Sequence, residues 1–143
     1  MSQTNELEIM ERIALDLEGV EESLASSFNT GAEDFNALIR PLSAAGGKRL
    51  RAQLCLLIAN AGTSVERQRI RIAEAVEMLH LATLIHDDVL DQAEIRRGED
   101  TIHMHKGNKV AILSGDYLFA KAFQIVSEMP NMKYLQIFSH IIT

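Results

Sequence analysis

Hydrophobic positions recur at intervals of three and four along residues 4–28, and glutamates fill many of the positions between them. This spacing places the apolar side chains on one face of a helix and the charged ones on the other. The segment is therefore predicted to form a long amphipathic helix, which Asn29-Thr30-Gly31 should end. The apolar positions are Leu7, Met10, Ile13, Ala14, Leu17, Val20 and Leu24.

Two shorter helices are predicted next, at 33–39 and at 48–61. The first extends past Pro41 and is followed by a break of small residues at 43–47. The second begins with basic residues and becomes strongly apolar before it ends near Gly62. Both segments have a helical rather than a strand-like pattern.

The longest helix is predicted at 65–92, where Ser64 can cap the first turn. Between Ala73 and Ile85, apolar residues occur on nearly every side of this helix. That distribution is typical of a helix surrounded by others in a bundle. We therefore expect this segment to be buried.

A polar loop at 93–101 precedes a helix at 103–128, which Pro130 limits. A last helix begins near Asn131 and is still apolar and periodic at the end of the sequence. No segment combines strict alternation with hairpin signals, so we predict no strands. The chain is predicted to be all-α, one domain of about six helices over residues 1–143, whose last apolar face expects partners outside this chain.

Composition narrows the class of protein. The chain is 47% hydrophobic and 24% charged, which is ordinary for a soluble globular domain. Its formal charge of −6 disfavours a nucleic-acid binder, since that role needs a basic surface. The single cysteine, Cys55, excludes an internal disulfide and lies in an apolar run, so it is predicted to be a small buried residue.

The N-terminus is acidic where a signal peptide would be basic, and no stretch reaches 18 uninterrupted apolar residues. We therefore expect a cytoplasmic protein without a transmembrane segment. A peripheral contact with a membrane stays open.

The strongest local signal is an aspartate cluster near the end of the longest predicted helix, formed by Asp87, Asp88 and Asp91. Asp87 and Asp91 lie one turn apart on the same face, with Asp88 beside them. Carboxylates at this spacing repel one another, and the C-terminal end of a helix disfavours anions. A hard cation such as Mg²⁺ would relieve both effects. The alternative is an acidic patch on an exposed helix end.

Two cationic clusters accompany the aspartates. The first is Gly46-Gly47-Lys48-Arg49-Leu50-Arg51, where a flexible backbone precedes strong hydrogen-bond donors. This arrangement suits the binding of an anion. The alternative is a solvated, basic start of a helix. Arg96 and Arg97 follow Asp91 closely and could neutralise the aspartates or clamp a phosphate. His80 lies two turns before Asp87 on the same side, where a merely buried histidine is the alternative. Together, the clusters fit two anionic substrates that meet over a metal.

Three segments in order strongly resemble the trans-isoprenyl diphosphate synthases, also called polyprenyl synthetases. The resemblance runs from about Ser43 to the C-terminus. It implies an all-α isoprenoid synthase bundle that condenses isopentenyl diphosphate with an allylic prenyl diphosphate, and commonly a homodimer or heterodimer. The segments are GGKRLR, EMLHLATLIHDDVLDQAEIRRGEDTIHMHKG and AILSGDYLFAKAF.

The resemblance assigns roles to individual residues. Asp87, Asp88 and Asp91 occupy the first aspartate-rich motif, whose outer pair holds Mg²⁺ bridging the allylic diphosphate. Arg96 matches an arginine that contacts the same diphosphate. The positions matching those that bind isopentenyl diphosphate are Lys48, Arg51, His80 and Arg97.

Product length is also implied by the resemblance. In this family the growing chain runs beside the aspartate-bearing helix, and bulky residues before the motif stop it early. Here the fifth residue before Asp87 is Ala82, with Met78 and Ala75 further back. The small residue resembles the longer-chain synthases, including the catalytic component of heptaprenyl-type enzymes. Alternatively, the alanines only allow close helix packing.

The chain also departs from the family, whose members are about twice as long and carry a second aspartate-rich motif. Asp87-Asp88 is the only adjacent aspartate pair here. We therefore predict a fragment or truncated form that is inactive alone; the alternative is a non-catalytic subunit or dimerisation module. A histidine-dependent phosphohydrolase using His103 and His105 would leave the arginines unexplained. A terpene cyclase would lack the lysine–arginine site.

Overall fold

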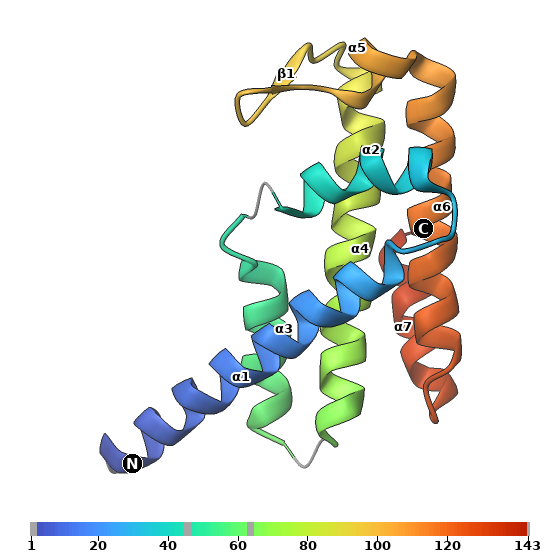
Figure 1. Ribbon diagram of the computed structural model, residues 1–143. Coiled ribbons are helices and arrows are strands. Elements are labelled where there is room, and N and C mark those ends of the chain that lie inside the picture. The colour runs from blue at the N-terminus through green and yellow to red at the C-terminus, as the bar shows by residue number, and fades with distance from the viewer. Residues whose placement is uncertain (1–2, 45–46, 63–64, 143) are drawn as a thin grey trace.

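The computed structural model describes residues 3–44, 47–62 and 65–142. Seven helices and one two-stranded hairpin make up the described part of the chain (Figure 1). The prediction of an all-α fold is confirmed, with the short hairpin as its one exception. The elements are α1 (Gln3–Ser27), α2 (Glu33–Ala44), α3 (Leu50–Asn60), α4 (Glu66–Leu90), β1 (Ile95–Arg96), β2 (Glu99–Asp100), α5 (Ile102–Lys106), α6 (Asn108–Ser127) and α7 (Met132–Ile142).

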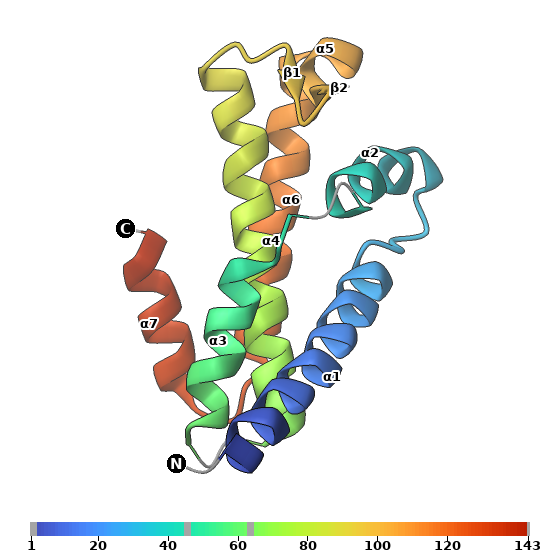
Figure 2. The ribbon, with the colours of Figure 1, turned by 90° about the vertical axis from the view of Figure 1, so that its left-hand side faces the viewer.

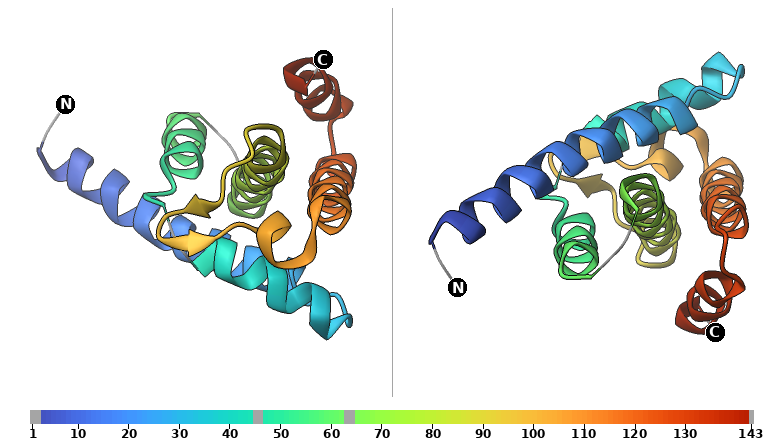
Figure 3. Two further views of the ribbon diagram at one scale, coloured as in Figure 1. Left: turned by 90° about the horizontal axis from the view of Figure 1, so that it is seen from above. Right: turned by 90° about the horizontal axis from the view of Figure 1, so that it is seen from below.

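The helices form two layers. Seen from above, α3, α4, α6 and α7 appear end on, while α1 and α2 run across one side of them (Figure 3). Helices α4 and α6 lie side by side along most of their length (Figures 1 and 2). The longest apolar helix therefore has neighbours on several sides, as its sequence predicted.

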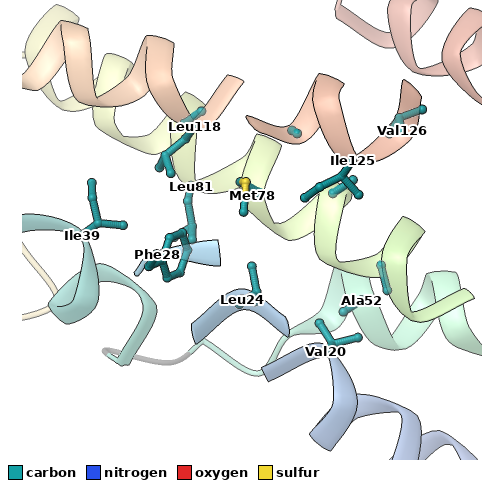
Figure 4. Close-up of a cluster of buried hydrophobic side chains, with 14 of the residues drawn as sticks. Val20, Leu24, Phe28, Ile39, Ala52, Met78, Leu81, Leu118, Ile125 and Val126 are labelled. Carbon is teal, nitrogen blue, oxygen red and sulfur yellow. The ribbon is translucent and has the colours of Figure 1, made fainter. Parts of the chain in front are cut away.

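The core lies where α1, α3, α4 and α6 meet (Figure 4). Burying a large apolar side chain of this kind contributes about 1.5–3 kcal/mol. The apolar face predicted for α1 packs against the core mainly in the second half of the helix. In the first half, Leu7 and Met10 remain largely exposed. Fully or almost fully buried side chains include Val20, Leu24, Phe28, Leu56, Met78, Leu118, Ile125 and Val126.

A buried ion pair fixes α1 against α4. Arg69 donates from Nε to Asp16 Oδ2 at 2.6 Å and from Nη2 to Oδ1 at 2.9 Å, and Asn60 of α3 adds a bond of 3.1 Å. Burial opposes ionisation of Asp16, but the hydrogen bonds from Arg69 and Asn60 and the charge of Arg69 hold its pKa below the usual value. This pair therefore depends on an ionised aspartate.

The prediction of one continuous helix at 103–128 is wrong at one point. It is divided at Gly107, whose φ of +80° suits glycine and interrupts the helical backbone. The result is the short helix α5 before the long helix α6, so the described chain has seven helices rather than six.

The segment predicted as a plain loop at 93–101 contains an antiparallel hairpin in which Ile95 pairs with Asp100. Its two turn residues, Arg97 and Gly98, both have positive φ (55° and 86°), as tight two-residue hairpin turns require. Arg-Gly is a weaker signal for such a turn than Asn-Gly, and the strands are only two residues long. Because the turn signal is weak and the strands are short, the sequence pattern did not predict this hairpin.

Other predicted boundaries hold closely. Helix α2 continues past Pro41, as expected, and runs on to Ala44, so it includes the first two residues of the predicted break at 43–47. The predicted cap at Ser64 lies outside the described residues, as does Gly46, and Val65 precedes the first turn of α4 without a side-chain cap bond. Cys55 is only partly buried, and that burial raises the pKa of its thiol.

Helix α6 is long and apolar enough to cross a membrane by length and composition, and is alone in this among the helices described. It packs against α4, α5 and α7. Core helices of soluble proteins pass the same test, so these two properties do not identify a membrane span.

Candidate active site

The aspartates lie at the C-terminal end of α4. Asp87 is in the last helical turn and Asp91 caps it, donating its backbone N–H to the Asp87 carbonyl at 2.8 Å. Both of these side chains are exposed, whereas Asp88 is buried. The structure therefore separates the predicted trio into an exposed pair one turn apart and a buried third member.

Asp88 is engaged by Arg96 of the hairpin. Arg96 donates from Nε to Asp88 Oδ1 at 2.7 Å, and its Nη2 lies 2.7 Å from the same oxygen. About a third of the Arg96 side chain remains exposed. The ion pair thus ties strand β1 to the end of α4, the turn that also carries Asp87 and Asp91.

The chemistry of the exposed aspartates suits a hard divalent cation such as Mg²⁺. Within residues 3–44, 47–62 and 65–142, no three His, Cys, Asp or Glu side chains are grouped closely enough to form a complete protein cage for a metal. Magnesium seldom needs such a cage, because it is commonly bound by one or two carboxylates together with substrate phosphates and water. The exposed carboxylates of Asp87 and Asp91 match that requirement.

The cations predicted to bind substrate meet at one cavity. Lys48, Arg51, His80 and Arg97 all line a cavity of about 170 Å³ between the start of α3, the middle of α4 and the hairpin. These residues come from three separate parts of the sequence, so only the fold brings them together. The positive charges of Lys48, Arg51 and Arg97 make this cavity a candidate for binding an anion, although Glu77 lines it too.

Arg97 lies close to the backbone at Gly47. A Cβ atom at this position would lie 2.9 Å from Nη2 of Arg97, closer than real Cβ contacts allow. The absence of a side chain therefore lets the hairpin arginine approach the backbone that leads into α3. A larger residue at position 47 would require only that the flexible end of Arg97 move aside.

Arg49 has a structural role that the sequence did not reveal. It is buried with a left-handed backbone (φ 46°), and its Nε and Nη2 atoms donate to Glu21 at 2.5 and 3.1 Å. Glu77 of α4 accepts a third bond from Arg49 at 3.5 Å and one from the Ala52 N–H at 3.0 Å. Glu21 and Glu77 therefore hold the start of α3 in place. The signal in the sequence that could have indicated this role is Glu77, a glutamate within an otherwise apolar stretch of α4.

His80 is held mainly neutral. Burial lowers its pKa, and the positive charges of Arg51, Arg97 and Arg96 lower it further, against the opposing effect of Glu77. A neutral imidazole can both donate and accept a hydrogen bond. At neutral pH His80 can therefore orient a bound ligand through hydrogen bonds, but it adds no positive charge to the cavity.

A second cavity of about 250 Å³ adjoins the first. It lies between α2, α4, α5 and the hairpin, and it shares Leu81, Leu84 and Arg97 with the cationic cavity. Asp88 and Arg96 line it as well. The Asp88–Arg96 pair therefore borders the second cavity and not the first.

The residues implied in product length lie in the core. Ala75, Met78 and Ala82 are fully buried, and they line none of the cavities described. This arrangement agrees with the alternative that the alanines allow close packing. Their effect on product length stays a prediction.

The histidines of the alternative phosphohydrolase site have local partners. His103 Nδ1 lies 3.0 Å from the Thr101 hydroxyl, and His105 Nε2 lies 3.7 Å from Asp100. His86, adjacent to Asp87, contacts α6 instead. The described residues therefore do not group these histidines with the aspartates.

The chain is similar to known proteins over most of its length. The sequence model of the family described as "Polyprenyl synthetase" matches residues 32–143. Octaprenyl diphosphate synthase of Escherichia coli is 33% identical over 134 residues, which cover 94% of this chain and 42% of that protein. Solanesyl diphosphate synthase 1 of Arabidopsis thaliana chloroplasts is 34% identical over 140 residues, covering 94% and 34%.

Solved structures of similar proteins have the same fold. A decaprenyl diphosphate synthase from Rhodobacter capsulatus superposes with a TM-score of 0.83 at 33% identity, covering 93% of this chain and 41% of that one. A Caulobacter crescentus polyprenyl synthase, complexed with calcium and isoprenyl diphosphate, gives 0.84 at 36% identity, covering 91% and 41%. Heptaprenyl diphosphate synthase from Staphylococcus aureus gives 0.83 at 28% identity, covering 90% and 41%.

The chain therefore spans between about a third and two fifths of the length of these relatives. The range of the family match, residues 32–143, contains the aspartates at the end of α4 and the residues around the 170 Å³ cavity. With the family match covering most of its length and the fold agreeing, this chain belongs to the polyprenyl synthetase family.

Proposed function

We propose that this chain supplies the diphosphate-binding part of a trans-polyprenyl diphosphate synthase, which condenses isopentenyl diphosphate with an allylic prenyl diphosphate. One observation carries the proposal: the cationic cavity around His80 and the exposed pair Asp87 and Asp91 belong to the same helix. His80 and Asp87 are seven residues apart, which is about 10 Å along a helix. Two diphosphates bound at these places would bring their carbon chains close together.

The cationic cavity would hold isopentenyl diphosphate. Lys48, Arg51 and Arg97 would bind the diphosphate by charge-assisted hydrogen bonds. His80, kept neutral, would orient this substrate rather than transfer a proton. The adjoining apolar residues Leu81 and Leu84 would exclude water from the reacting carbons.

The exposed aspartates would hold magnesium with the allylic diphosphate. A bound Mg²⁺ would stabilise the negative charge that develops on the departing diphosphate. Asp87 and Asp91 would supply its carboxylate ligands, and Arg96, which is paired with Asp88 on the same helix end, would contact the same diphosphate. The calcium-bound Caulobacter crescentus relative supports a divalent ion in this role.

In the proposed reaction, the allylic C–O bond breaks and its electron pair leaves with the diphosphate. The isopentenyl double bond then attacks the allylic cation, forming the new C–C bond. Loss of a proton from the product cation restores a double bond. The role of this chain is to position the two substrates, stabilise the leaving group and exclude water.

The 143-residue chain alone should bind diphosphate weakly and turn over little, because it covers 34–42% of the sequence relatives and holds one aspartate-rich motif. We also propose a cytoplasmic protein that works as a homodimer or heterodimer. A non-catalytic subunit or dimerisation module is a second candidate, favoured by an exposed apolar face on α3. That face comprises Leu50, Leu54, Leu57 and Ile58.

Isothermal titration with a non-hydrolysable diphosphate analogue tests the proposal. We expect binding that strengthens with Mg²⁺, and we expect Asp87→Ala to remove that increase but not the metal-independent part. Arg51→Ala should weaken binding with and without Mg²⁺. Asp34→Ala, at an exposed site in the first turn of α2, is the matched control and should behave as the unaltered chain.

Two results would decide against an active-site fragment. Binding that does not respond to Mg²⁺, or that survives Asp87→Ala unchanged, would remove the metal site. A stable dimer without metal-dependent binding, seen by light scattering, would favour the non-catalytic module.

A further inference from the structure

We propose that His86 is a positioning residue: seated on Gly115, it sets the rotation of the end of α4 that carries Asp87 and Asp91. The inference rests on the proposed function, because it concerns the orientation of the metal-binding pair. His86 precedes Asp87 directly, yet its side chain points to α6 rather than to either cavity.

The contacts of His86 come from one face of α6. Its Nε2 atom lies 3.1 Å from the Ile112 carbonyl oxygen and 3.4 Å from Asp116 Oδ1, and its ring centroid lies 5.4 Å from that of Phe119. Ile112, Gly115, Asp116 and Phe119 follow the spacing of one helical face. They form a seat for the imidazole at its ring nitrogen, its face and its edge.

Gly115 completes the seat. It is buried, and a Cβ atom built at this position would overlap the His86 ring. Only a glycine lets the ring lie directly against the α6 backbone here. Because the clash would fall on the ring rather than on a flexible chain end, a methyl group at position 115 must displace α4 or eject the imidazole.

This contact determines where the aspartates point. Successive helical residues are separated by a fixed rotation, so fixing His86 fixes Asp87, and one turn later Asp91. With Nε2 protonated, His86 donates a hydrogen bond to the Ile112 carbonyl, and this bond fixes the orientation of the imidazole on α6. Two metal-binding carboxylates need to be held within about 0.5 Å of productive geometry. The α4–α6 contact supplies that constraint from outside the aspartate cluster.

The test compares His86→Ala, Gly115→Ala, their combination and His86→Gln in the 143-residue chain. Titration with the same diphosphate analogue, with and without Mg²⁺, separates the metal-dependent part of binding from the rest. We expect His86→Ala and Gly115→Ala each to weaken the metal-dependent part roughly tenfold, the loss typical of disturbed ligand orientation. Binding without metal should stay unchanged, since the cationic cavity is separate.

The combined variant gives the sharpest result. Removing the imidazole leaves room for the Gly115→Ala methyl group, so the pair should be no worse than His86→Ala alone, in both binding and unfolding midpoint. His86→Gln keeps a side-chain N–H donor and should recover part of the loss. His140→Ala, at an exposed histidine on α7, is the matched control. Fully additive losses in the combined variant would overturn the proposed seat.

Amide hydrogen exchange tests the positioning without any ligand. We expect faster exchange of the Asp91 N–H, which bonds to the Asp87 carbonyl, in His86→Ala but not in His140→Ala. Unchanged exchange together with unchanged metal-dependent binding would overturn the inference. If the unaltered chain shows no metal-dependent binding, the proposed function fails, and exchange at Asp91 still decides whether His86 orients this turn.

Discussion

Arg96 reaches from the hairpin to Asp88 on α4, with Nε and Nη2 each 2.7 Å from the same carboxylate oxygen. The aspartate is buried and the arginine is one-third exposed. This pair joins the loop after the aspartate motif to the helix that carries the motif. It therefore couples the position of Arg96 and Arg97 to that of Asp87 and Asp91.

Replacing Arg96 should loosen the hairpin. Arg96→Ala leaves the buried Asp88 carboxylate without this partner, and we expect a loss of about 1–3 kcal/mol in the free energy of unfolding, measured with urea. Arg96→Lys should recover only part, because an ammonium group cannot place two donors on one carboxylate in the same plane. Arg40→Ala, which removes an exposed pair with Glu33, is the control and should cost less than about 1 kcal/mol. Equal losses at the two sites would contradict this account.

The buried pair of Asp16 and Arg69 should make stability depend on acidity. The pKa of Asp16 is lower in the folded chain than its ordinary value of 3.8, so the unfolded chain binds the proton more readily. The stabilisation is therefore complete above about pH 5 and is lost as the pH falls through the folded pKa, below 3.8. Urea unfolding between pH 7 and 3 measures this loss.

Variants of both partners check this account of the Asp16–Arg69 pair. Asp16→Asn should flatten this part of the pH dependence. Arg69→Met should cost less than Arg69→Ala, because it fills the space while Arg69→Ala also leaves a cavity. If Asp16→Asn keeps the full acid sensitivity, another carboxylate is responsible.

His80 should produce a separate effect nearer neutral pH. Its pKa is lowered by burial and by the arginines, so the unfolded chain, with a value near 6.5, takes up the proton first. Stability should therefore fall as the pH decreases from above 6.5 towards the folded pKa, and then level off. His80→Gln should abolish this step in a pH series of thermal unfolding, whereas His140→Gln should retain it. A step that persists in His80→Gln would reject the assignment.

Ala82 offers a test of product length in a full-length protein that contains this chain. Ala82→Phe should shorten the product if the growing chain passes this position. Because Ala82 is fully buried here, the larger ring should also cost about 1–3 kcal/mol through overpacking. The measurement is the product distribution by chromatography, together with a thermal unfolding curve. An unchanged distribution in a folded variant would leave Ala82 as a packing residue only.

Much of the helical architecture could be predicted because its signals are local. The apolar spacing in α1, α4 and α7 requires only the period of a helix and the contrast between apolar and polar side chains. The same period puts Asp87 and Asp91 on one face whatever surrounds them. The break at Gly107 was missed because a single glycine within a helical pattern is often tolerated.

The partners of charged residues could not be predicted in the same way. Arg49 stands between Lys48 and Arg51 and lines the same cavity, yet its guanidinium group bonds to Glu21 and Glu77. Such choices depend on which helices come together after folding, and no local pattern encodes that.

The sequence by itself determined the helices, the shared face of Asp87 and Asp91, and the residue types that can bind diphosphate. Only the tertiary structure decided that Asp88 pairs with Arg96, that Lys48, Arg51, His80 and Arg97 line one cavity, and that His86 rests on Gly115. The physical reason is the separation along the chain over which each interaction acts. A helical period acts over a few residues, whereas ion pairs and close contacts between elements arise only when packing brings distant segments within a few ångströms.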